Sequence, residues 1–204
     1  MSYANMFELK SCLKDAIAYC EAHAERVHSQ TYTELLTKAY ADLLSAVEVS
    51  NKHFTSWRVE DREDKMAWKN LAKELRETQI ELARVGAVGY FDQRILYWDT
   101  DLLAAAVKEM LEYLEDRKDD LDFAQKKIDV LQRQTSQALN EDFESGQKLK
   151  QYLRFAQVRS DAMKNAINTI SGFRRVLRKD LGKGSEEYLA LRWPIAVASD
   201  EALI

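Results

Sequence analysis

Proline and glycine are scarce in this sequence, and this scarcity constrains the fold more than any other feature. Among 204 residues there is a single proline, Pro194, and there are six glycines. Because both residues interrupt regular helices, the chain has few places at which a helix must end. The sequence therefore predicts an all-α fold, an elongated antiparallel helical bundle or coiled coil of four to six helices.

The clearest periodic pattern runs through residues 103–138, where apolar side chains recur at alternating steps of three and four residues. Only Arg117 interrupts it. A heptad pattern of this length is typical of one long, coiled-coil-like helix. Turn-forming residues follow at 140–146, and a last long helix is expected over about 149–181. We expect these two helices to form a hairpin.

The N-terminal half contains shorter apolar patterns. A first helix is expected over about 5–26, and a second from Thr31, because Thr31 and Glu34 have the spacing of a capping box. Periodicity is lost over 51–60, which predicts a turn, and it resumes in a third helix from Trp68. Residues 1–192 are thus expected to form a single elongated helical domain, followed by an irregular C-terminal tail at 193–204.

Nothing in the sequence indicates a membrane span or a secretory signal. No stretch of about 18 apolar residues is present, and the first ten residues lack a basic segment followed by an apolar block. Cys12 and Cys20 lie about 12 Å apart along one expected helix, too far for a disulfide. These observations favour a cytoplasmic protein with two reduced, buried cysteines.

The last long helix has a second apolar stripe beside its main one. It consists of Phe155, Ala162, Ala166 and Phe173. A stripe this wide exceeds what one partner helix can cover, so the helix is expected either at the centre of a bundle or against a second chain. A homo-oligomer, most simply a dimer, is one of the two expectations.

The sequence offers no set of residues typical of an active site. Glu25 and His28 have the Glu-x-x-His spacing of di-iron bundles, but such a site needs a second copy and further carboxylates. Neither cysteine has a histidine at a spacing that suggests activation, and no serine lies in a nucleophile-elbow motif. We therefore expect no enzyme activity, no metal, no cofactor and no small-molecule substrate.

Charge is distributed unevenly along the chain. The net charge is −4, yet residues 61–145 hold 13 basic against 20 acidic side chains, and residues 146–192 hold 11 against 4. Five basic residues of the last helix fall within an arc of about 80° at 100° per residue. This basic face is the candidate surface for an anionic partner, and it comprises Lys150, Arg154, Lys164, Arg175 and Lys179, widened by Arg174 and Arg178.

The basic face has three candidate partners. Anionic lipid headgroups attract such a face by about 1 kcal/mol per basic residue. A nucleic-acid backbone would also be attracted, but no aromatic residues lie between the basic ones, so nucleic acid is the least favoured partner. Alternatively, a turn at 140–146 would bring Asp116, Asp119 and Asp120, within the acidic segment 109–122, beside Lys164 and neutralise the face within the molecule.

A short set of motifs resembles the BAR module of sorting nexins. The motifs are Phe91-Asp92-Gln93-Arg94 with Trp98, then Leu121, Ala124 and Ile128, then Asp142-Phe143-Glu144. The similarity covers roughly residues 75–155. It implies a crescent-shaped antiparallel dimer that binds curved, anionic membranes.

Two functions follow from the sequence. The first is a non-catalytic helical scaffold or adaptor that self-associates and presents helical faces to a protein partner. The second is a BAR-like peripheral membrane module that uses the basic face. The first rests on the wide apolar stripe and on the lack of catalytic motifs, and the second on the charge pattern and the resemblance.

Overall fold

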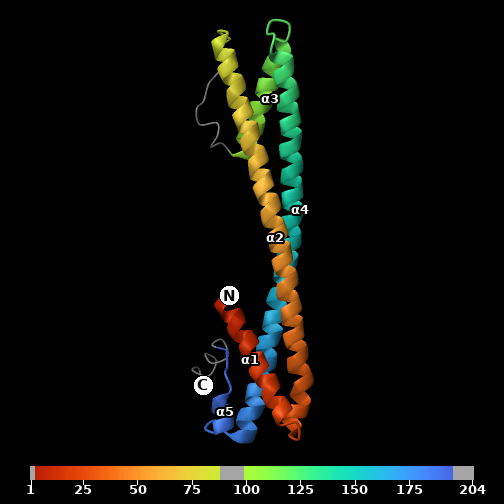
Figure 1. Cartoon of the computed structure of the whole chain (residues 1–204), viewed down its shortest axis with the longest axis vertical. Coiled ribbons are helices and arrows are strands. Elements are labelled where there is room, and N and C mark those ends of the chain that lie inside the picture. Colours follow the sequence, from red (N-terminus) through yellow and green to blue (C-terminus); the bar gives the residue numbers. More distant parts are fainter. Residues whose placement is uncertain (1–2, 88–98, 195–204) are drawn as a thin grey trace. The chain divides into compact units, whose positions relative to one another are not determined.

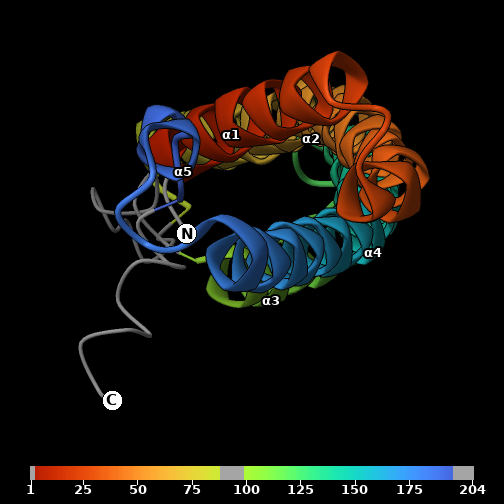
Figure 2. The same ribbon diagram turned by 90° about the horizontal axis from the view of Figure 1, so that it is seen from below.

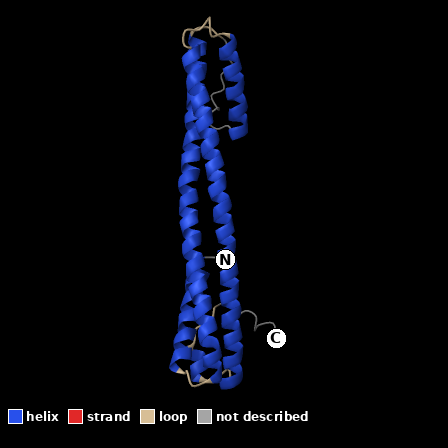
Figure 3. Cartoon of the chain, turned by 90° about the vertical axis from the view of Figure 1, so that its right-hand side faces the viewer, coloured by secondary structure: helices blue, strands red, loops and turns tan. Residues whose placement is uncertain are grey.

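A computed structural model describes residues 3–87 and 99–194, and every regular element within those ranges is a helix (Figures 1 and 3). The elements are α1 (Tyr3–Ala22), α2 (Val27–Arg84), α3 (Thr100–Asp116), α4 (Ala124–Leu181) and α5 (Glu186–Ala190). The predicted all-α class is confirmed. The two longest helices, α2 and α4, have 58 residues each.

The chain divides into two compact units. Residues 1–53 and 152–204 form the terminal unit, which contains α1, α5 and the adjoining parts of α2 and α4. Residues 54–151 form the central unit, which contains α3 and the remaining parts of α2 and α4. Figure 2 views the terminal unit end-on, with α1 and α5 near the viewer. Residues 195–204 of the predicted tail lie outside the described residues.

The turn predicted at 51–60 is wrong, because α2 continues through these residues. Its sequence contains neither proline nor glycine from end to end. His53, Phe54 and Trp57 are all half-buried although they point in different directions around the helix, so the apolar residues here do not form one stripe. Loss of a single clean stripe therefore does not mark a helix end here.

The start of α2 also differs from the prediction. The chain breaks between α1 and α2 at residues 23–26, and Thr31 lies inside the helix. The Thr31 hydroxyl donates to the carbonyl of Val27 four residues earlier, at 3.0 Å, and so does not cap a helix start. A threonine followed by a glutamate three residues later is compatible with either role.

The hairpin predicted at 140–146 is wrong as well. Residues 140–146 lie within α4, and the chain instead reverses between α3 and α4 at 117–123. Four successive residues there are charged and exposed, Arg117, Lys118, Asp119 and Asp120. The single helix predicted over 103–138 is therefore two helices that lie on either side of this reversal.

The heptad pattern nevertheless identified the core of the central unit. It continues across the reversal because α3 and α4 turn their apolar stripes toward the same cluster of side chains. Leu114, Ile128 and Leu131 are fully buried in it, opposite Leu71, Leu75 and Leu82 of α2. A heptad repeat indicates which side chains face a core. The repeat does not distinguish one continuous helix from two helices that pack on the same core.

The terminal unit has its own core, to which α1, α2, α4 and α5 all contribute. Its fully buried side chains include Leu9 and Leu13 of α1, Leu36 and Leu43 of α2, and Ile170, Phe173 and Leu177 of α4. α2 and α4 run in opposite directions here, since His28 contacts Asp180 and His53 stacks on Phe155.

The predicted end of the last long helix is confirmed. α4 stops at Leu181, and Gly182 follows with φ of 84°, a left-handed conformation that favours glycine. The Gly182 amide donates to the carbonyl of Arg178 at 3.1 Å. Ser185 then caps α5, since its hydroxyl accepts from the amide of Tyr188.

Among the described residues, no helix is long and apolar enough to cross a membrane.

Two glycines of α4 provide a test of its continuity. A Cβ at Gly146 would meet no atom within 4 Å, so Gly146→Ala should stabilise the fold by about 0.5–1 kcal/mol, as expected within a helix. Gly182→Ala should destabilise it by about 1 kcal/mol, because φ is positive there. Urea denaturation of both variants gives the comparison. Destabilisation by Gly146→Ala would show that the chain turns at 140–146 after all.

Candidate interaction surface

The second apolar stripe of α4 divides into a buried half and a half that lines an open groove. Ala166 and Phe173 are fully buried in the core of the terminal unit. Phe155 and Ala162 are only half-buried, and they line a groove between α2 and α4. The wide stripe is therefore covered within the chain along one half, while the other half lies beside open space.

The groove has a volume of about 440 Å³ and a largely apolar floor. No residue of α1 or α5 lines it, so it lies where α2 and α4 alone face each other. Its apolar lining consists of Ala46, Val49, Phe155, Val158 and Ala162, and its polar lining of Asp42, Ser45, Asp161 and Asn165. The ring of Phe155 stacks on that of His53, with centroids 4.1 Å apart and planes at 10°.

Val158 is the most accessible large apolar side chain of the groove, at 48 % exposure. Asp161 lies on the rim beside it, where it accepts from the Gln157 amide at 3.0 Å and pairs with Lys164 at 3.7 Å. Both of these partners belong to α4 itself. The rim thus combines an exposed apolar side chain with a carboxylate that contacts neighbouring side chains of its own helix.

The structure places most residues of the basic face on the exposed side of α4. Lys150, Arg154, Lys164, Arg175, Arg178 and Lys179 are all exposed. Lys150 belongs to the central unit and the other five to the terminal unit. Within the described ranges, Arg154 forms no ion pair, whereas Lys164 pairs with Asp161.

Arg174 differs from the rest of the predicted basic face, because it is 91 % buried. Its Nε donates to the hydroxyl of Tyr188 at 2.9 Å, and its guanidinium lies 5.4 Å from the ring centroid of Trp193. Arg174 therefore holds α5 and the following residues against α4. The sequence did not predict the burial of Arg174. Helix periodicity places this residue at the boundary between the polar and the apolar face of α4, next to exposed basic residues.

The predicted neutralisation of Lys164 by the acidic segment 109–122 depended on the turn at 140–146, which the structure lacks. Asp116, Asp119 and Asp120 lie at the end of α3 and in the reversal that follows, within the central unit. The partner of Lys164 is instead Asp161 on its own helix.

Glu25 and His28 do not share a site. His28 is nearly buried, and its Nδ1 lies 2.9 Å from the Asp180 carboxylate. Glu25 is exposed and lies within 3.8 Å of His23 and Arg26. Glu25 and His28 therefore have separate partners near the junction of α1 and α2.

Arg26 connects the α1–α2 junction to α5. Its guanidinium donates to both carboxylate oxygens of Glu187, at 2.6 and 3.1 Å, and to the Tyr19 hydroxyl at 2.7 Å. Tyr19 donates to Glu187 as well. The hydrogen bonds from Arg26 and Tyr19 lower the pKa of Glu187 to about 2, and burial raises the pKa of Tyr19 to about 12.

The central unit contains a cluster of carboxylates that sequence reasoning missed. Glu60 of α2 and Glu141 and Glu144 of α4 have carboxylate oxygens within 4.8 Å of one another, a spacing that suits a cation. Desolvation and the charges of Glu144, Glu63 and Glu60 raise the pKa of Glu141. No sequence signal pairs residue 60 with residue 141 unless both helices are known to continue past these positions.

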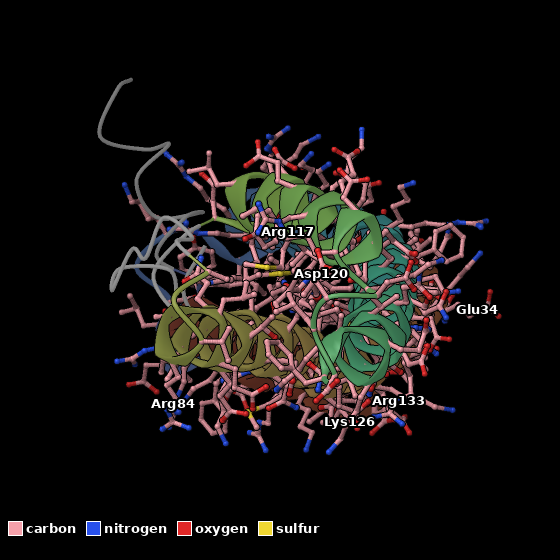
Figure 4. The ribbon with its side chains drawn as sticks, turned by 90° about the horizontal axis from the view of Figure 1, so that it is seen from above. Glu34, Arg84, Arg117, Asp120, Lys126 and Arg133 are labelled. Atoms are coloured by element: carbon pink, nitrogen blue, oxygen red, sulfur yellow. The ribbon has the colours of Figure 1, made fainter. Side chains whose placement is uncertain are left out.

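Lys127 is a buried cation of the central unit. Its ammonium lies 2.9 Å from Glu74 and 3.4 Å from Glu81, both on α2. Its neighbour Lys126 is exposed, and Figure 4 shows Lys126, Arg84 and Arg133 at the periphery of the unit. This ion pair joins α4 to α2 and is part of the packing.

Both cysteines are free and buried, as the sequence predicted. Burial, with nearby carboxylates, raises the pKa of Cys12 to about 11, and burial raises the pKa of Cys20 to the same value. Each thiol therefore stays protonated at neutral pH, which favours a packing role.

Comparisons of this chain with protein-family models, with curated proteins and with solved structures found no match.

Two glutamates should influence stability in opposite directions with pH. Glu187 has a folded pKa of about 2, below its ordinary 4.5, so its contribution is complete above about pH 4.5 and is lost as the pH falls toward 2. Glu141 has a raised pKa, so it destabilises the fold at neutral pH and ceases to do so once protonated. Near pH 7, Glu187→Gln should lower the melting temperature and Glu141→Gln should raise it.

Thermal denaturation of the two variants between about pH 3 and pH 8 provides the measurement. The Glu187→Gln difference should shrink as the pH falls from about 4.5 toward 2, because the folded pKa of Glu187 is about 2. The Glu141→Gln difference should shrink at higher pH, as the pH falls through the raised pKa of Glu141 toward 4.5. A pH-independent difference for either variant would contradict the assigned electrostatic cause.

Proposed function

We propose that this chain is a non-catalytic helical scaffold or adaptor, which self-associates and presents helical faces to a protein partner. In this proposal α2 and α4 form the antiparallel, coiled-coil-like pair of a helical bundle. The observation that carries the proposal is the apolar groove of the terminal unit, where half of the wide stripe of α4 lies open between two helices.

The groove has the composition of a protein-binding surface. Its floor consists of aliphatic side chains and one aromatic ring, and polar groups lie at its rim. An apolar centre with a polar rim is the usual anatomy of an interface between proteins. Covering Phe155, Val158 and Val49 would remove apolar surface from water, at roughly 25 cal/mol for each Å².

The polar contacts of the terminal unit support a structural role for its ionisable and thiol side chains. His28 pairs with Asp180, Arg26 binds Glu187 and Tyr19, and both cysteines are buried thiols. These pairs join α1, α2, α4 and α5 to one another. Residues that sequence reasoning had to consider for catalysis are thus used to hold the helices of this unit together.

Self-association can be tested through one exposed side chain of the groove. The unaltered chain should elute with a mass near twice 23.6 kDa in size-exclusion chromatography with light scattering. Val158→Arg should yield a monomer with unchanged helicity, because a charge would be buried at the interface but remains exposed in the free chain. Leu153→Arg is the matched control.

Leu153 suits this control because it is 56 % exposed on the same helix and does not line the groove. Five residues at 100° each place it about 140° away from Val158 around α4. A chain that stays monomeric at every concentration would refute self-association. A dimer that tolerates Val158→Arg as well as Leu153→Arg would show that this groove is not the contact.

A second candidate function is binding to an anionic membrane surface. The observation that favours it is the exposure of six of the seven predicted basic residues on one helix. Its BAR-like form, which implies a crescent-shaped dimer, rests on the resemblance of residues 75–155 alone. Five of the motif residues for that resemblance, Phe91-Asp92-Gln93-Arg94 and Trp98, lie outside the described residues.

Membrane binding can be tested by co-sedimentation with liposomes that contain phosphatidylserine. If the basic face binds lipid, the chain should sediment at low salt and be released near 1 M salt, where the Debye length is about 3 Å. Charge reversal at Arg175 and Lys179 should abolish binding without unfolding, since both are exposed. Liposomes of neutral lipid provide the control, and no sedimentation at low salt would exclude this function.

A further inference from the structure

We infer that a second copy of this chain covers the groove. The grooves of the two copies face each other, and α4 of one copy runs antiparallel to α4 of the other. This inference rests on the proposed self-association and adds the surface and the direction of the contact. Two observations on α4 carry it. They are the apolar side chains that line the groove and the two opposite charges that flank them.

The apolar side chains of α4 suit an antiparallel contact. Phe155 and Val158 both line the groove, three residues apart on one face of the helix. When two copies of α4 run in opposite directions about a two-fold axis near residue 157, Phe155 of each copy lies opposite Val158 of the other. A large ring then packs against a half-exposed branched side chain twice, once on each side of the axis.

The charges beside the groove complement each other in the same arrangement. Arg154 and Asp161 are seven residues apart, so they lie on one edge of α4 on either side of residue 157. The antiparallel contact brings Arg154 of each copy next to Asp161 of the other, which gives two equivalent pairs of opposite charge. A two-fold contact repeats each pair by symmetry.

A parallel two-fold contact would not form these pairs. It places the edge of α4 that carries Arg154 and Asp161 beside the opposite edge of the partner helix, so these two side chains would lie on opposite sides of the contact from their copies. The charge pattern therefore favours the antiparallel direction.

The free chain leaves these two side chains available. Arg154 is exposed and forms no ion pair within the part of the chain that the structure describes. Among the residues that the structure describes, Asp161 is bound by Gln157 and Lys164 of its own helix alone, and its side chain is 60 % exposed. An exposed pair of this kind is weak, so Asp161 can accept a further basic partner at little cost.

A charge exchange tests the direction of the contact. Arg154→Asp alone and Asp161→Arg alone should each weaken the dimer at least tenfold, because like charges would then meet twice across the axis. The double variant Arg154→Asp with Asp161→Arg should restore the dissociation constant to within about threefold of the original. Sedimentation equilibrium at low salt measures all four proteins, and circular dichroism verifies that each remains helical.

Cross-linking provides a second measurement that does not depend on charge. A cysteine in place of Val158 would lie near its own copy at the axis, so a short bismaleimide should convert this variant to a covalent dimer. Leu153→Cys should remain a monomer under the same conditions. Cys12 and Cys20 are buried, and the unaltered chain serves as the control for their reaction.

The outcomes separate this inference from the proposed function. Rescue by the double exchange together with selective cross-linking at residue 158 would support the antiparallel contact. A dimer in which the single exchanges have no effect and cysteines at 153 and 158 react alike would overturn the inference while self-association stands. A monomer throughout would overturn both.

Discussion

Within each unit, the packing of α2 against α4 is the interaction on which the rest of the structure depends. A long amphipathic helix gains little stability by itself, and it persists in water when its apolar stripe is covered by another element. In the terminal unit this pairing places His28 against Asp180 and His53 against Phe155. In the central unit it places Glu74 against Lys127. α1, α3 and α5 then cover the stripes of these two helices in part.

The sequence predicted the all-α class and most of the core residues correctly, but it did not predict where the helices end. Leu114, Ile128 and Leu131 were correctly assigned to a core by their spacing. The same spacing hid the reversal at 117–123, because side chains on both sides of it face one cluster. Where glycine or proline truly decides the backbone, as at Gly182, the prediction held. Where glycine lies within a helix with open space beside it, as at Gly146, the prediction of a turn failed.

The sequence predicted only part of the candidate interaction surface. Phe155 and Ala162 stood out as members of a stripe too wide for one partner, and the groove accounts for them. The contribution of Ala46 and Val49 was not visible, since it depends on the pairing of two distant segments. The burial of Arg174 was missed for the same reason, because Tyr188 and Trp193 reach it only after the chain turns back at Gly182.

The buried ammonium of Lys127 determines the axial alignment of α2 and α4 in the central unit. Apolar contacts repeat every seven residues, so leucines alone would tolerate a shift of one heptad with modest loss. Such a shift would carry Lys127 away from Glu74 and Glu81, by about 10 Å at 1.5 Å per residue. An unpaired charge inside the core would then oppose the shifted state. The ion pair therefore selects one alignment of α2 against α4 from the several that the spacing of apolar residues would allow.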